Sequence, residues 1–262
     1  MLSFAALYPL ISAAFALCMV VLVTVIGERW GTRIGGLVGT IPSLLLIALI
    51  FIGLDNGPES AASSASIVIL EMGANITFLS LYLLTIHRGI IQALIASMSV
   101  WALISYLILV TGGFGIAGNS LLYFLMLITN LALLKNIGIS STPIKIKYSL
   151  KELSFRGILG GTAIGSAVFL SKIGGPVIGG IFAVFPAIFL STMIIYSLKH
   201  DIGVPRAMGK SMTLGSLNVF SYALTASLTF PVWGIWLGTV SSLSASIITS
   251  LLLLRFTKRN LR

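Results

Sequence analysis

One row of polar and aromatic residues could carry chemistry. Glu71, Asn75, Phe78 and Tyr82 are separated by four, three and four positions, which places them on one face of an α-helix. If this helix crosses a membrane, a charged carboxylate in it costs roughly 2.5–3.5 kcal/mol or more, so Glu71 is a candidate functional residue. Two interpretations stay open. Glu71 could trade a proton for a cationic solute, or it could stay neutral and donate a hydrogen bond to a carbonyl group.

A second row has a similar pattern and consists of Ser211, Gly215, Asn218, Tyr222 and Thr225. Asn75 and Asn218 each lie near the middle of an apolar segment, which predicts two amides near the bilayer midplane, where inverted-repeat transporters bind their substrates. Such amides can also simply join helices by hydrogen bonds. The residues predicted to lie along a path for a solute or ion are Glu71, Asn75, Tyr82, Asn218 and Tyr222. The second row has no acid, because Leu214 stands at about the position that matches Glu71.

The composition indicates that these rows lie in membrane helices. Of the 262 residues, 57% are hydrophobic and 8% are charged, and the mean hydropathy is +1.10. This balance is typical of an all-α integral membrane protein, in which apolar runs of about 20 residues span the hydrocarbon. Nine such transmembrane helices are predicted, at about 4–26, 35–54, 65–86, 89–111, 116–137, 155–173, 176–198, 209–230 and 233–255.

The basic residues predict the orientation. With the N-terminus outside and the C-terminus inside, fifteen of the sixteen Lys and Arg residues, Arg156 among them, fall in inner loops, at inner helix ends or in the tail, and only Lys172 lies outside. The net charge of +10 is therefore explained by topology. Membrane lipids and a small solute or ion are the expected partners, and nucleic acid is not.

Other chemistries find little support in the sequence. Cys18 is the only cysteine, and neither His87 nor His200 has neighbours at the spacing of metal ligands, so no metal site, cofactor or enzymatic activity is expected. Gly157, Gly161 and Gly165 recur every four residues, which predicts a close helix-packing face.

An internal repeat predicts how the helices are organised. Residues 34–43 read IGGLVGTIPS and residues 178–187 read IGGIFAVFPA, so Gly35, Gly36 and Pro42 match Gly179, Gly180 and Pro186. Proline should kink each helix. The kinks and glycines could form two alternating gates, or the glycines could serve packing alone.

Because five predicted spans precede the second copy, the two copies should be inverted relative to each other. The predicted units are a four-helix repeat at 1–111, a linker helix and loop at 112–154, and a second four-helix repeat at 155–262.

The phrase GGIFAVFPAIFLSTMIIYSLKHD at 179–201, followed by a basic residue and a polar helix from Arg206 to Tyr222, resembles the GlpM/YdgC family of small four-helix inner-membrane proteins. The resemblance covers roughly 174–231 well and 30–90 less well. It implies an inner-membrane, dual-topology unit, here fused to an inverted copy through a linker helix. It implies no particular chemistry.

The expected function is a secondary transporter that works by alternating access, with a small cationic or amphipathic solute and proton coupling as the expected mode. A passive channel is one alternative, since fluoride channels also occur as fused inverted four-helix pairs. The Gly-Gly-x-x-Gly-Ala-x-x-Arg signature of those channels is absent from the sequence. A non-transporting scaffold protein is the other alternative.

Overall fold

The computed structural model describes residues 7–29, 42–137 and 147–259, and every regular element in these ranges is a helix. Gly35 and Gly36 lie outside the described residues. The helices are α1 (Tyr8–Arg29), α3 (Ser43–Asn56), α4 (Pro58–Thr85), the 3₁₀-helix η2 (Ile86–Arg88), α5 (Ile90–Thr111), α6 (Gly115–Leu133), α7 (Leu150–Ala183), α8 (Ala187–Lys199) and α9 (Gly203–Arg259).

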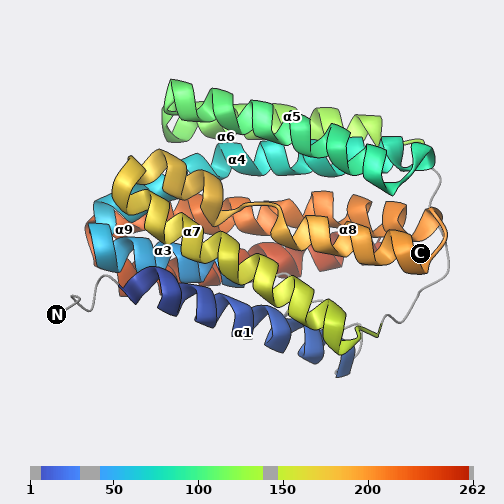
Figure 1. Cartoon of the computed structure of the whole chain (residues 1–262). Coiled ribbons are helices and arrows are strands. Elements are labelled where there is room, and N and C mark those ends of the chain that lie inside the picture. The colour runs from blue at the N-terminus through green and yellow to red at the C-terminus, as the bar shows by residue number, and fades with distance from the viewer. Residues whose placement is uncertain (1–6, 30–41, 138–146, 260–262) are drawn as a thin grey trace.

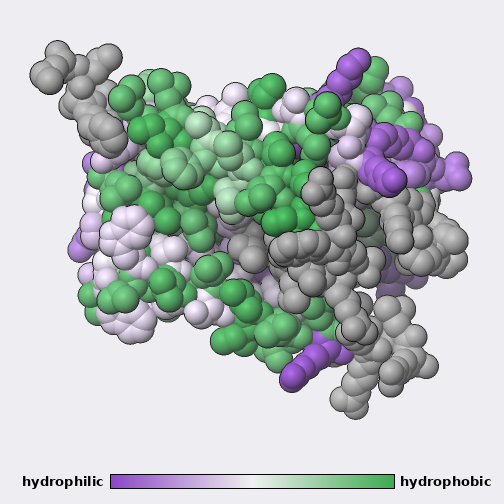
Figure 2. Space-filling model, turned by 90° about the horizontal axis from the view of Figure 1, so that it is seen from below, coloured by the Kyte–Doolittle hydropathy of each residue, from purple (hydrophilic) through white to green (hydrophobic). Residues whose placement is uncertain are grey.

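Long apolar helices form a bundle with an apolar surface. Six helical segments of the described chain are long and apolar enough to cross a membrane. Large apolar side chains such as Leu10, Ile91 and Trp236 are exposed on the outer helices. Figure 2 shows apolar residues over much of one face, with hydrophilic ones gathered mainly towards one end. The chain is therefore an all-α, multi-pass membrane protein.

The two longest helical segments each turn back on themselves at a glycine. Gly175 has φ 79° and ψ −174°, and Gly234 has φ 71° and ψ −179°, a region of backbone conformation that favours glycine. A Cβ atom on Gly179 would lie 2.6 Å from Cβ of Ser171, although residues eight apart in a straight helix are separated by about 12 Å. Helix α7 therefore consists of two antiparallel stretches, 150–174 and 176–183.

Helix α9 reverses in the same way. Ser241 Oγ donates to Thr229 Oγ1 at 3.3 Å, and Thr249 Oγ1 donates to Ser221 Oγ at 2.8 Å, across the turn at Gly234. The described segments that could cross a membrane number six rather than the nine expected, because each reversing segment counts once and because α3 has only 14 residues.

A second kind of break interrupts α7 and α8. Helix α7 ends at Ala183, Val184 is its C-cap, Pro186 is the N-cap of α8, and α8 begins at Ala187. In Figure 1 a short non-helical link joins the last part of α7 to α8, which continues in the same direction. Pro42 likewise stands directly before α3 as its N-cap. At both positions where the sequence predicts a kink, a helix therefore begins, as expected for a residue without an N–H group.

Helix α4 lies at the centre of the bundle and packs against α3, α5, α6, α7 and α9. Helix α1 instead packs against stretch 150–174 of α7. A Cβ atom on Gly161 would lie 2.8 Å from the carbonyl oxygen of Ala13, and one on Gly165 would lie 2.9 Å from that of Pro9. The packing face predicted from the spacing of the glycines is confirmed.

Candidate functional site

Glu71 lies in the middle of α4 and is fully buried. Its Oε1 accepts a hydrogen bond of 2.7 Å from Ser105 Oγ on α5, and the indole of Trp101 is a neighbour. Within the described chain, Glu71 Oε2 and Trp101 Nε1 have no partner in hydrogen-bond geometry, and no ion pair includes Glu71. Since a buried carboxylate is costly without a partner, the site can hold a proton at Oε2.

Asn75 lies one turn further along α4 and contacts the interruption between α7 and α8. Its Nδ2 donates to the carbonyl oxygen of Val184 at 2.6 Å, and its Oδ1 has no partner in the described chain. A helix interruption leaves carbonyl groups without their usual partners, and buried carbonyl groups need one. Asn75 therefore supplies a hydrogen-bond donor to a carbonyl group at the interruption between α7 and α8.

Tyr82 continues the row alongside α8. Its hydroxyl oxygen lies 2.9 Å from Ser197 Oγ and donates to the carbonyl oxygen of Met193 at 3.4 Å, and its ring stacks with that of Phe78. Glu71, Asn75 and Tyr82 thus share one face of α4, which is covered by α5 and by the interrupted pair α7–α8. We call these three residues the α4 row.

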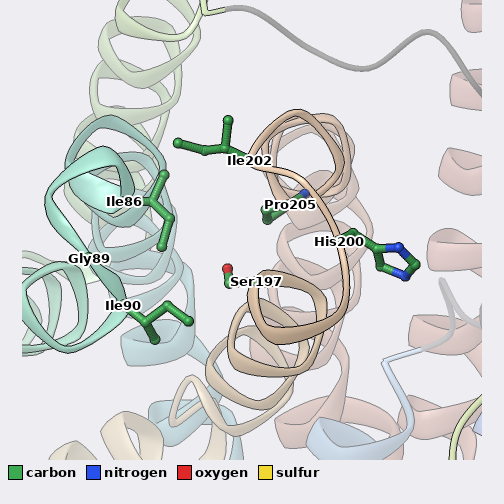
Figure 3. Close-up of a pocket in the computed structure, with 7 residues that line it drawn as sticks. All are labelled: Ile86, Gly89, Ile90, Ser197, His200, Ile202 and Pro205. Carbon is green, nitrogen blue, oxygen red and sulfur yellow. The ribbon is translucent and has the colours of Figure 1, made fainter.

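A small cavity adjoins the Tyr82 end of the α4 row. It has a volume of about 160 Å³ and its lining includes Ile86, Ile90, Ser197 and Pro205. Figure 3 shows Ser197 on the side of the cavity opposite Ile86 and Ile90, while the ring of His200 points away. Because Ser197 also contacts the hydroxyl group of Tyr82, the cavity and the row share a polar contact.

Asn218 and Tyr222 lie on α9, outside the α4 row. Both side chains are buried, and neither Asn218 Oδ1 nor the Tyr222 hydroxyl group has a hydrogen-bond partner in the described chain. Thr239, beyond the turn at Gly234, is a neighbour of Tyr222. Although α9 packs against α4, no hydrogen bond joins the amides of Asn75 and Asn218. The structure thus brings three of the five predicted path residues onto one face.

Glycine contacts and side-chain bonds fasten stretch 176–183 to its neighbours. A Cβ atom on Gly180 would lie 2.6 Å from the carbonyl oxygen of Ser64 on α4, and one on Gly179 would meet Ser171. Ser64 Oγ donates to the carbonyl oxygen of Pro176 at 3.0 Å. The two glycines therefore serve close packing around the turn at residue 175.

Two further contacts join the turn in α7 to the corner between α3 and α4. Lys172 Nζ lies 3.1 Å from Asp55 Oδ1, and Asn56 Nδ2 donates to Ser171 Oγ at 3.1 Å. They connect segments more than a hundred residues apart in the sequence.

The charge pattern predicts Arg156 among the inner basic residues, and the structure buries its side chain inside α7, with 7% exposure. Its NH1 donates to Thr192 Oγ1 on α8 at 2.7 Å. The signal that could have located it is the capping box from Ser149 to Glu152, an S-x-x-E pattern that marks the start of a helix. That start places Arg156 two turns inside the helix.

Comparison with known families finds one match. Residues 153–258 match the sequence model of a family described as a protein of unknown function, DUF3147. That part of the chain is similar to an uncharacterised family. The match covers the second predicted repeat and leaves the GlpM/YdgC resemblance a prediction. Neither a curated protein nor a solved structure matches the chain. Among the described residues, no group of three or more His, Cys, Asp and Glu is placed to hold a metal ion.

Proposed function

We propose that the protein is a secondary transporter that moves a small solute across the cell (cytoplasmic) membrane by alternating access. The observation that carries this proposal is the hydrogen bond from Asn75 to the carbonyl group of Val184, at an interruption between two helices inside the bundle. Interrupted membrane helices are tolerated where their backbone is covered by protein or lines a path, and transporters bind solutes at them. The buried Glu71 one turn away adds a group that could carry a proton.

The proposed topology has nine crossings, with the N-terminus outside and the C-terminus inside, as two inverted four-helix repeats (1–111 and 155–262) around a linker (112–154). The reversals inside α7 and α9 support it, because each adds a crossing. So does the packing of α1 on stretch 150–174 and of α4 on α9, since these pairs are the expected counterparts in the two repeats.

The proposed path follows the α4 row. At one end the Asp55–Lys172 pair joins the two repeats, and at the other end the cavity beside Ser197 lies next to Tyr82. We propose that α8 tilts at the interruption between Val184 and Ala187, so that the row opens to one side at a time. Glu71 would release a proton when a small cationic solute binds beside it.

Finding the solute comes first. Thermal unfolding of the purified protein is screened against inorganic cations, organic amines, anions and lipid phosphates. A compound that binds at the row should raise the midpoint in the wild type, and Asn75→Ala should abolish the shift. Asn218→Ala tests whether the second row takes part. Hits indifferent to both substitutions would contradict a site at the predicted midplane.

The hit is then tested in liposomes with Glu71→Gln, which keeps the shape of the side chain and removes its ionisation. Uptake driven by a pH gradient should be lost, while exchange without a gradient can persist. Glu59→Gln is the matched control, because Glu59 is an exposed acid in the first turn of the same helix. Flux that does not saturate with solute concentration would indicate a channel instead, and pH-driven uptake that survives in Glu71→Gln would refute the coupling role.

A further inference from the structure

We propose that Arg156 forms a binding site for an oxyanion, separate from the α4 row. Arg156 is a buried cation with no acidic partner in the described chain, where the two ion pairs are Asp55–Lys172 and Glu152–Lys199. Glu152, one turn away on the same helix, is thus engaged by another cation. A buried charge without a counter-charge is costly, so a ligand that supplies one would bind with a large advantage.

Hydroxyl groups gather around the guanidinium group. Its NH1 donates to Thr192 Oγ1 at 2.7 Å, its carbon lies 5.0 Å from the centre of the Tyr148 ring, and its Nε is buried without a partner in the described chain. The Tyr148 hydroxyl group donates to that of Tyr196 at 3.4 Å. Thr192 and Tyr196 lie one turn apart on α8, so they share a face.

These groups suit an oxyanion in particular. The planar guanidinium fork binds the oxygens of phosphate or carboxylate groups through two parallel hydrogen bonds. Thr192 accepts from Arg156 and Tyr196 accepts from Tyr148, so the hydroxyl hydrogens of Thr192 and Tyr196 can themselves be donated to an anion. A positively charged ligand would be repelled by the same arrangement.

The site lies on a different face of α8 from the α4 row. Thr192 and Tyr196 face Arg156, whereas Met193 and Ser197 contact Tyr82. Arg156 is seven residues from the helix cap at Ser149, about 10 Å along the helix axis. A phosphate group bound there could belong to a lipid headgroup that enters from the membrane or to a free solute, and the chemistry of recognition would be the same.

The test measures thermal unfolding of the delipidated, purified protein with two probes. The first is inorganic phosphate, compared with chloride at equal ionic strength. The second is phosphatidylglycerol mixed into phosphatidylcholine nanodiscs, compared with phosphatidylcholine alone. At least one probe should raise the midpoint of the wild type. Arg156→Gln should weaken the apparent affinity by about tenfold or more, and Thr192→Val by a few-fold, because each removes donors to the anion.

The matched control is Lys151→Gln, which removes an exposed positive charge five residues earlier on the same helix and should leave the affinity unchanged. A response to phosphate alone identifies a soluble ligand, and a response to phosphatidylglycerol alone identifies a lipid. No response to either probe would overturn the proposal, as would an equal loss in Lys151→Gln and Arg156→Gln. If Arg156→Gln does not fold, Arg156→Lys takes its place, since it keeps the charge and loses the fork. None of these outcomes depends on Glu71 or on transport.

Discussion

The two stretches of α7 use glycine in the same way but lie in different surroundings. Stretch 150–174 packs against α1, where Gly161 and Gly165 bring the helices close enough for a Cβ atom to touch backbone oxygens. Stretch 176–183 packs against α4, where Gly180 does the same beside Ser64. The first stretch is a continuous helix, whereas the second begins at a turn and ends at an interruption.

The difference lies in the polar groups that accompany the glycines. Around stretch 176–183, Ser64 donates to the carbonyl group of Pro176 and Asn75 donates to that of Val184. In the contact with α1, the hydroxyl group of Ser12 donates to the carbonyl oxygen of Pro9 in its own helix. Close packing through glycines is therefore a property of both interfaces. The described hydrogen bonds from side chains to carbonyl groups at a turn or a helix interruption belong to the second interface.

The largest loss of stability is expected at the packing glycines, which both stretches of α7 share. Gly161→Ala and Gly180→Ala each place a methyl group within 3 Å of a backbone oxygen, so each should lower the free energy of unfolding by about 1–3 kcal/mol or more. Gly215→Ala is the control, because no atom lies within 4 Å of its added Cβ, and it should be neutral or stabilising by up to about 1 kcal/mol. The measurement is reversible unfolding in mixed micelles. Equal effects of all three substitutions would show that close packing does not decide either interface.

A smaller change in the free energy of unfolding should distinguish the polar contacts of the two stretches of α7. Asn75→Ala leaves the carbonyl group of Val184 buried without its partner and should cost about 1–2 kcal/mol. Ser12→Ala, beside the first stretch, removes a bond to a carbonyl group of the same helix and should cost less than about 0.5 kcal/mol. The same unfolding measurement compares them. If Ser12→Ala lowers the free energy of unfolding as much as Asn75→Ala, the hydrogen bond to the helix interruption does not distinguish the two stretches.

The sequence predicts the helical class, the packing glycines and the row on α4, because hydropathy and periodicity depend on local patterns. Pro186 also marks where α8 begins. Two features of the structure cannot be predicted from the sequence. The burial of Arg156 depends on how α7 meets α8, and the partner of Asn75 depends on which backbone group an interruption exposes. Both are long-range consequences of packing, which no spacing within one helix encodes.

The bonds that accompany the second stretch continue to α8 through Tyr82. Tyr82→Phe removes the contacts of the hydroxyl group with Ser197 and Met193, which should cost about 1 kcal/mol. In Tyr222→Phe the lost hydroxyl group has no hydrogen-bond partner in the described chain, so the substitution should be neutral or stabilising. Thermal midpoints of the two variants, measured in one detergent, make the comparison. A larger loss in Tyr222→Phe would mean that this hydroxyl group bonds in solution, to its neighbour Thr239 or to a bound partner.

The smallest effect is expected at the ion pair between Glu152, near the start of stretch 150–174, and Lys199, at the end of α8. Lys199 Nζ lies 2.7 Å from Glu152 Oε2, but the same oxygen also accepts from the backbone N–H of Ser149. Lys199→Met therefore leaves Glu152 with a partner and should cost less than about 1 kcal/mol, with the difference from wild type shrinking in about 1 M salt. A loss of more than about 2 kcal/mol that salt does not change would mean that charge clamps α8 to the first stretch. A weak tie instead leaves α8 held by packing, by the α4 row and by the hydrogen bond from Arg156 to Thr192, and these contacts decide whether α8 can tilt at the interruption.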